Sequence, residues 1–139
     1  MKEEEKKLQE KYMEMKMMEE QMKEIQKQAQ TVEQQLLELT ATKQSLDDFK
    51  KTEKGDQVLV PISAGIFAKA ELKSNKEFLV NVGSDTIVTK DIESTKKLME
   101  KQVEEMSELH TKINMQMQKL ALHAASIEQE LRELAAKLQ

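Results

Sequence analysis

Two long segments of the chain repeat apolar side chains every seven residues and contain neither glycine nor proline. The first segment spans residues 3–50 and the second spans residues 92–138. A stripe of this period is narrower than the buried face of a globular helix, so each segment is predicted to be one coiled-coil helix. At 1.5 Å per residue, a helix of about 48 residues is roughly 70 Å long.

The apolar positions of each segment form two interleaved series, which we expect to face a partner helix. In the first segment, one series is Leu8, Met15, Met22, Ala29 and Leu36, and Lys43 follows it at the same spacing. The other series is Met18, Ile25, Val32, Leu39 and Leu46, and Lys11 precedes it at the same spacing. In the second, the series are Ile92, Met99, Met106, Ile113, Leu120, Ile127 and Leu134, and Lys96, Val103, His110, Met117, Ala124, Leu131 and Leu138. Because the segments match in length, we predict an antiparallel pair in which opposite residue numbers add to about 140, so that both chain ends meet.

The insert between these helices, residues 57–90, loses the helical period and gathers β-branched residues into short runs. Turn-forming residues separate the runs at 63–65, 73–76 and 83–85. We therefore predict two β-hairpins, with strands at 57–62, 67–72, 78–82 and 86–90. Pro61 has no backbone donor, so its strand is expected to lie at a sheet edge or to end there. Asp91 is expected to cap the second helix.

Short strands of this kind cannot bury their own apolar faces, and they leave hydrogen-bonding edges open. The physical expectation is oligomerisation through the hairpins, in which other chains supply the missing strands and close a β-barrel. The residues predicted to carry this assembly are Val58, Val60, Ile62, Ile66, Phe67, Ala68, Leu72, Phe78, Val80, Val82 and Ile87.

Composition argues against several classes of function. The chain has no cysteine, and its net charge of −4 comes from finely mixed charges without a basic patch. Disulfide frameworks and the usual zinc modules need cysteine, and nucleic-acid binding needs clustered positive charge. No stretch approaches the roughly 20 apolar residues of a membrane span. We therefore expect a single cytoplasmic unit over residues 1–139 that binds neither nucleic acid nor membrane.

Residues that could carry chemistry are few. His110 and His123 have no carboxylate at ligand spacing around both, and His110 falls on the seam, where a polar residue is expected to tune register or partner choice. The turns at 73–76 and 83–85 lack the length and the following helix of a phosphate loop. We expect no enzyme activity, no metal site and no cofactor.

Surplus apolar residues gather near the free end of the predicted pair. With the seams at positions a and d, Met13 and Met17 point to solvent, beside Tyr12, and Met115 and Leu122 do so on the second helix. Contiguous exposed apolar surface usually marks an interaction site, and flexible methionine suits binding of varied sequences. The pattern predicts a promiscuous binding surface.

The layout of helix, two hairpins and helix resembles the prefoldin family. Three motifs of the insert carry the resemblance: Leu-Val-Pro-Ile-Ser-Ala-Gly at 59–65, Ala-Lys-Ala-Glu-Leu at 68–72 and Val-Asn-Val-Gly-Ser-Asp at 80–85. Two hairpins are typical of the α class, whereas the β class has one hairpin and a shorter insert. Archaeal members often have Gly-Ala-Gly where this chain has Ser63-Ala64-Gly65.

The resemblance implies a hexamer of two α-class and four β-class subunits, in which the hairpins form a β-barrel platform that carries the coiled coils. It also implies an ATP-independent chaperone that captures unfolded client proteins and delivers them to a group II chaperonin. Clients would then contact the coiled-coil tips. The residues predicted to bind them are Leu8, Tyr12, Met13, Met17, Leu134 and Leu138.

Two other functions stay open from the residues alone. A structural scaffold or tether would use the hairpins only to assemble, and a regulatory module would bind one specific helix along the coil. A tether is expected to have polar free ends that bind nothing, whereas the free end of this chain carries a cluster of methionines. A specific helix binder needs a defined groove, which a two-helix coil hardly offers.

Overall fold

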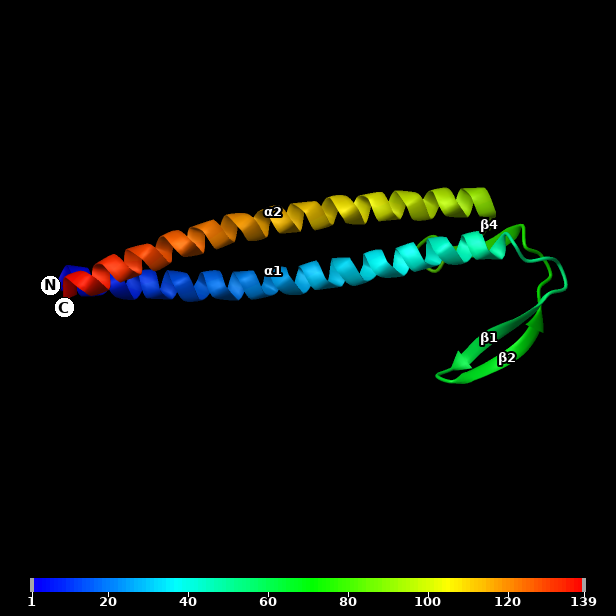
Figure 1. The fold of residues 1–139 in the computed structure, drawn as a ribbon, viewed down its shortest axis with the longest axis horizontal. Helices are drawn as coiled ribbons and strands as arrows, with labels where there is room; N and C mark the ends of the chain where they lie inside the picture. Colours follow the sequence, from blue (N-terminus) through cyan, green and yellow to red (C-terminus); the bar gives the residue numbers. More distant parts are fainter. Residues whose placement is uncertain (1, 139) are drawn as a thin grey trace. The chain divides into compact units, whose positions relative to one another are not determined.

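The computed structural model describes residues 2–138 and consists of two long helices with two β-hairpins between them (Figure 1). Its elements are α1 (Lys2–Phe49), β1 (Gln57–Ser63), β2 (Ile66–Glu71), β3 (Glu77–Asn81), β4 (Ile87–Asp91) and α2 (Ile92–Leu138). The predicted pair of long helices with two β-hairpins between them is confirmed, and each strand begins and ends within one residue of its predicted bounds.

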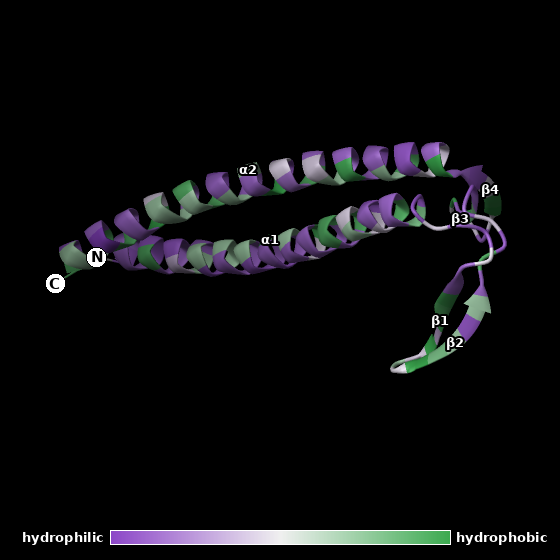
Figure 2. Ribbon diagram, turned by 45° about the vertical axis from the view of Figure 1, so that its right-hand side comes forward, coloured by the Kyte–Doolittle hydropathy of each residue, from purple (hydrophilic) through white to green (hydrophobic). Residues whose placement is uncertain are grey.

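The chain divides into two compact units. The coil unit takes its described residues from 2–35 and 106–138, and the hairpin unit covers residues 36–105. Figure 2 shows apolar segments recurring along both helices and again around the turn between β1 and β2.

Side chains from the predicted seams form the core of the coil unit. Met18, Ala124 and Ile127 are buried together, and Ile127 is only 2% exposed. Packed against them are Met15, Met22, Leu120 and Leu131. Since Met22 and Leu120 meet in one cluster, the antiparallel alignment predicted for them is confirmed.

Interhelical ion pairs follow the same alignment in each unit. In the coil unit, the Lys11 Nζ atom lies 2.7 Å from the Glu130 carboxylate. In the hairpin unit, Lys96 lies 2.8 Å from Asp47. The pair with Glu130 raises the pKa of Lys11 above its ordinary value, and the Lys96 ammonium lowers the pKa of Asp47 by hydrogen bonding to it. All four side chains stay partly open to solvent, so these pairs add little stability.

The hairpin unit contains two separate antiparallel sheets, β1–β2 and β3–β4. In the first, Val60 lies opposite Ala68, and the ladder becomes irregular between Pro61 and Ser63. The strand therefore continues past Pro61, and with two strands in the sheet it is an edge strand, which is the first of the two predicted outcomes. In the second sheet, Val80 lies opposite Val88.

Tight turns close both hairpins. Gly65 has a φ of +79°, a left-handed conformation that glycine adopts without steric cost. In the β3–β4 turn, Gly83, Ser84 and Asp85 all have positive φ values. The Asn81 side chain supports this turn by accepting a hydrogen bond from the Gly83 N–H at 2.9 Å.

Contacts at the helix ends hold the second hairpin in place. The rings of Phe49 and Phe78 pack edge to face with centroids 5.6 Å apart, joining the end of α1 to β3. The Asn75 side-chain amide donates to the Thr52 carbonyl at 2.6 Å. At the start of α2, the Asp91 carboxylate accepts the Ser94 N–H at 2.7 Å, which confirms the predicted cap and lowers the pKa of Asp91.

Candidate functional site

Three of the six predicted client-binding residues lie on the outer face of α1. Tyr12 is 60% exposed, Met13 is 67% exposed and Met17 is 61% exposed. Met13 and Met17 are neighbours on the helix surface because they are four residues apart, and Tyr12 directly precedes Met13 in the sequence. This end of α1 therefore presents three large apolar side chains to solvent, which we call the α1 patch (Tyr12, Met13 and Met17).

The helical period explains why this patch stays uncovered. Met15 and Met18, which alternate with its residues along the chain, turn inward and pack against Ile127 and its neighbours. A seven-residue stripe is already satisfied by these inward side chains, so the α1 patch contributes nothing to helix pairing. Its apolar character needs another explanation.

The other three predicted client-binding residues, Leu8, Leu134 and Leu138, are half-buried seam residues. The structure therefore separates the predicted set into an exposed group and a group that packs between the helices. Leu134 still reaches a surface pocket of about 260 Å³, whose other lining residues are Lys7, Glu10, Lys11, Glu130, Glu133 and Lys137.

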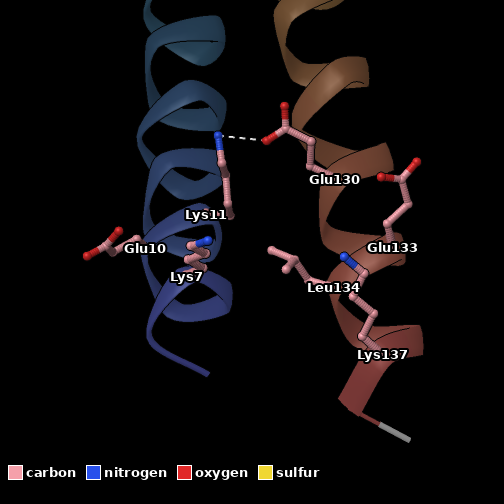
Figure 3. Close-up of a pocket in the computed structure, with 7 residues that line it drawn as sticks. All are labelled: Lys7, Glu10, Lys11, Glu130, Glu133, Leu134 and Lys137. Carbon is pink, nitrogen blue, oxygen red and sulfur yellow. Dashed lines mark ion pairs between the residues drawn. The ribbon is translucent and has the colours of Figure 1, made fainter. Parts of the chain in front are cut away.

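Figure 3 shows how this pocket is arranged: Leu134 points from α2 toward α1, next to the Lys11–Glu130 ion pair that bridges the helices. Lysines and glutamates contribute equally to the rim. An apolar side chain could rest on Leu134 whatever the charge of its neighbours. The pocket is thus chemically suited to varied sequences rather than to one ligand.

Both histidines pair with glutamates across the coil unit. His110 Nε2 lies 3.1 Å from Glu33, and His123 Nε2 lies 3.3 Å from Glu14. The contact with His123 is the main reason that the pKa of Glu14 is lowered, with Lys11 adding to the effect. Each histidine thus meets one carboxylate on the other helix. Within residues 2–138, no three His, Asp or Glu side chains lie close enough together to hold a metal ion.

Exposed apolar residues also cover the hairpins. Six predicted assembly residues are exposed and the other five are half-buried; the exposed ones are Val60, Ile62, Ile66, Phe67, Val82 and Ile87. The half-buried ones are Val58, Ala68, Leu72, Phe78 and Val80. The first hairpin is apolar on both faces near its turn, since Pro61 and Phe67 pair on the side opposite Val60 and Ala68.

Four large exposed apolar side chains within residues 2–138 were not among the residues that the sequence singled out. Leu59 and Leu79 are 63% and 77% exposed on the hairpins, and Leu37 and Leu109 are 72% and 43% exposed on the helices. Leu59 lies on the same face of the first hairpin as Phe67, and Leu79 lies on the same face of the second hairpin as Ile87. Leu37 directly follows the seam residue Leu36, and Leu109 directly precedes the seam residue His110. The heptad register could therefore have predicted that both side chains are exposed.

None of the described helices combines the length and apolarity that crossing a membrane requires.

Comparison with known proteins gives a consistent result. The family model described as prefoldin subunit matches residues 18–137. Among curated relatives, the prefoldin subunit alpha of Methanobrevibacter smithii is 30% identical, covering 83% of this chain and 78% of the relative. That of Pyrobaculum aerophilum is 32% identical, covering 81% and 83%.

A solved structure matches the fold. It is a chain of the filamentous prefoldin of Methanocaldococcus jannaschii, with a TM-score of 0.73 and 17% identity over 86% of this chain and 96% of that one. The two long helices, the paired hairpins and the family match over most of the chain agree with the resemblance seen in the sequence. The two curated relatives named above are α-class subunits, and the chain belongs to the prefoldin family of chaperone subunits.

Proposed function

We propose that this chain captures unfolded client polypeptides through the α1 patch and the adjoining ends of its two helices. The observation that carries the proposal is the exposure of Tyr12, Met13 and Met17 beside a core that does not need them. Methionine and tyrosine offer adaptable apolar contact, which suits clients with no common sequence.

The strength of each contact supports holding rather than tight binding. Fully burying one such side chain contributes only about 1.5–3 kcal/mol, and a mobile client covers it incompletely. Several subunits that engage one client raise the overall affinity without any strong single site. Client capture of this kind needs no cofactor, no ATP and no catalytic group, so we propose a holding chaperone and not an enzyme.

Prefoldin subunits form hetero-oligomeric complexes, and the hairpins of this chain support the same behaviour. We propose that exposed residues such as Val60, Phe67 and Ile87 pack against β-class subunits, two α-class and four β-class chains together closing a β-barrel. As the family resemblance implies, the complex would work in the cytoplasm and pass clients to a group II chaperonin.

The test is a light-scattering aggregation assay on this chain assembled with a β-class partner. The double variant Met13→Glu and Met17→Glu should lose much of its protection of an aggregating client, since both changes place charge on the α1 patch. Glutamate is a good helix former, so helicity should be kept. Leu37→Glu is the matched control, because Leu37 is 72% exposed but belongs to the hairpin unit.

Point variants separate surface from core better than deletions do. Removing the first 18 residues would also remove Met18, which is buried in the coil-unit core. Circular dichroism and mass measurement should show that the double variant folds and assembles. Full protection by the double variant would place client binding elsewhere. A structural tether predicts no protection even from the unmodified complex.

A further inference from the structure

Methionines in the coil unit fall into two classes of accessibility. Met13, Met17 and Met115 are 67%, 61% and 55% exposed. Met18 is 7% exposed and lies in the core with Ala124 and Ile127, and Met15 and Met22 are half-buried against that core. Residues of identical chemistry thus alternate between solvent and core within a single turn or two of α1.

Thioether sulfur reacts with peroxides according to its access to solvent. A sulfur lone pair attacks one oxygen of hydrogen peroxide, an S–O bond forms, and the O–O bond breaks. The departing oxygen leaves as water after the proton of the transferred oxygen moves to it. The thioether is oxidised to a sulfoxide and the peroxide is reduced, so the step needs only a peroxide as co-reactant.

Oxidation has opposite consequences at the two classes of position. A sulfoxide at Met13 or Met17 makes the α1 patch polar, while the seam and its packing stay unchanged. A sulfoxide at Met18 would bury a polar oxygen without a hydrogen-bond partner, at a cost to the helix pair. The structure shields Met18, whose oxidation would weaken the helix pair, and exposes Met13 and Met17, whose oxidation would only alter the surface.

We propose that Met13 and Met17 form a peroxide-sensitive modification site that lowers client capture while the coil stays folded. This inference rests on the function proposed above, because it assigns regulation to the same surface. A methionine sulfoxide reductase would restore the original side chains.

The first arm of the test measures the modification itself. The assembled complex is treated with hydrogen peroxide, and tandem mass spectrometry of its peptides follows each methionine over time. Met13, Met17 and Met115 should be oxidised several-fold faster than Met18. Equal rates at Met13 and Met18 would overturn the proposal, whatever the complex does with clients.

The second arm measures the consequence. Peroxide should reduce protection of an aggregating client by the unmodified complex, with helicity kept, and reductase treatment should restore protection. The double variant Met13→Leu and Met17→Leu has no sulfur at these positions, so peroxide should not lower its protection below that of the same variant left untreated. Met18→Leu, the matched control, should remain as sensitive as the unmodified chain.

These arms separate the two claims. If the untreated complex does not protect clients, the proposed function fails, while the order of oxidation still tests the modification site. If the double leucine variant loses protection as the unmodified chain does, oxidation acts elsewhere, for example on the partner subunits, and the inference is wrong.

Discussion

Ile127→Ala should loosen the coil unit, because Ile127 is the most completely buried large side chain among the described residues. The change removes three carbon atoms, and about 0.8 kcal/mol per buried methylene gives roughly 2.4 kcal/mol. A core only two helices wide can partly collapse into the space, so little cavity energy is added. We expect a loss of about 2–3 kcal/mol in the free energy of local opening.

Hydrogen exchange on the assembled complex measures this loss directly. At about 1.4 kcal/mol per factor of ten, amides near Met18 and Ala124 should exchange about 30- to 150-fold faster in the variant. Leu122→Ala is the matched control, because Leu122 lies on the same helix but is 74% exposed. It should change exchange little, as expected for a surface substitution.

The comparison can refute the reasoning. Equal exchange in the Ile127→Ala and Leu122→Ala variants would mean that the cluster around Ile127 does not hold the helices together. Faster exchange throughout the hairpin unit would mean that the two units do not open independently.

Two further predictions concern assembly and pH. Val60→Asp should weaken association with a β-class partner but keep most helicity, because Val60 is exposed on the first hairpin. Native mass measurement tests the association and circular dichroism tests the helicity. A complex that forms as well as the unmodified one would contradict the prediction. The pKa values of Glu14, Asp47 and Glu93 are lowered mainly by hydrogen bonds to His123, Lys96 and Lys50. Because these pKa values lie below the ordinary 4.5 of glutamate and 3.8 of aspartate, the unfolded chain binds protons more readily than the folded chain does. The three carboxylates therefore contribute fully to the stability of the fold above about pH 4.5, and this contribution should fade as the pH falls further. A helicity that rises on acidification would contradict this prediction.

Helix geometry made most of the fold predictable from sequence. A seven-residue period fixes which side chains turn inward. Between Met18 and Val32 on α1, the side chain at each predicted seam position is buried or half-buried. Asp91 was predictable as a cap because its side chain acts locally on Ser94.

Other features depend on information that the pattern does not contain. Leu59 and Leu79 were missed because alternation marks one apolar face of a strand, whereas apolar side chains lie on both faces of these hairpins. On β3, the face that carries Phe78 packs on Phe49, and Leu79 lies on the open face. The pairing of His123 with Glu14 depends on helix stagger and rotamers, which the heptad alone leaves open. The heptad placed Leu134 in the seam, but for the same reason it could not show that Leu134 would also reach a surface pocket.

Site-specific photo-crosslinking tests the central claim most directly, since it records where an unfolded client touches the chain. A photoreactive residue is placed at Met13 or, in a separate sample, at Leu37, and each complex is irradiated with the same unfolded client. Both positions are well exposed, so accessibility alone does not distinguish them. We predict strong crosslinks to the client from position 13 and few from position 37. Crosslinks from position 37 with none from position 13 would contradict client capture by the α1 patch.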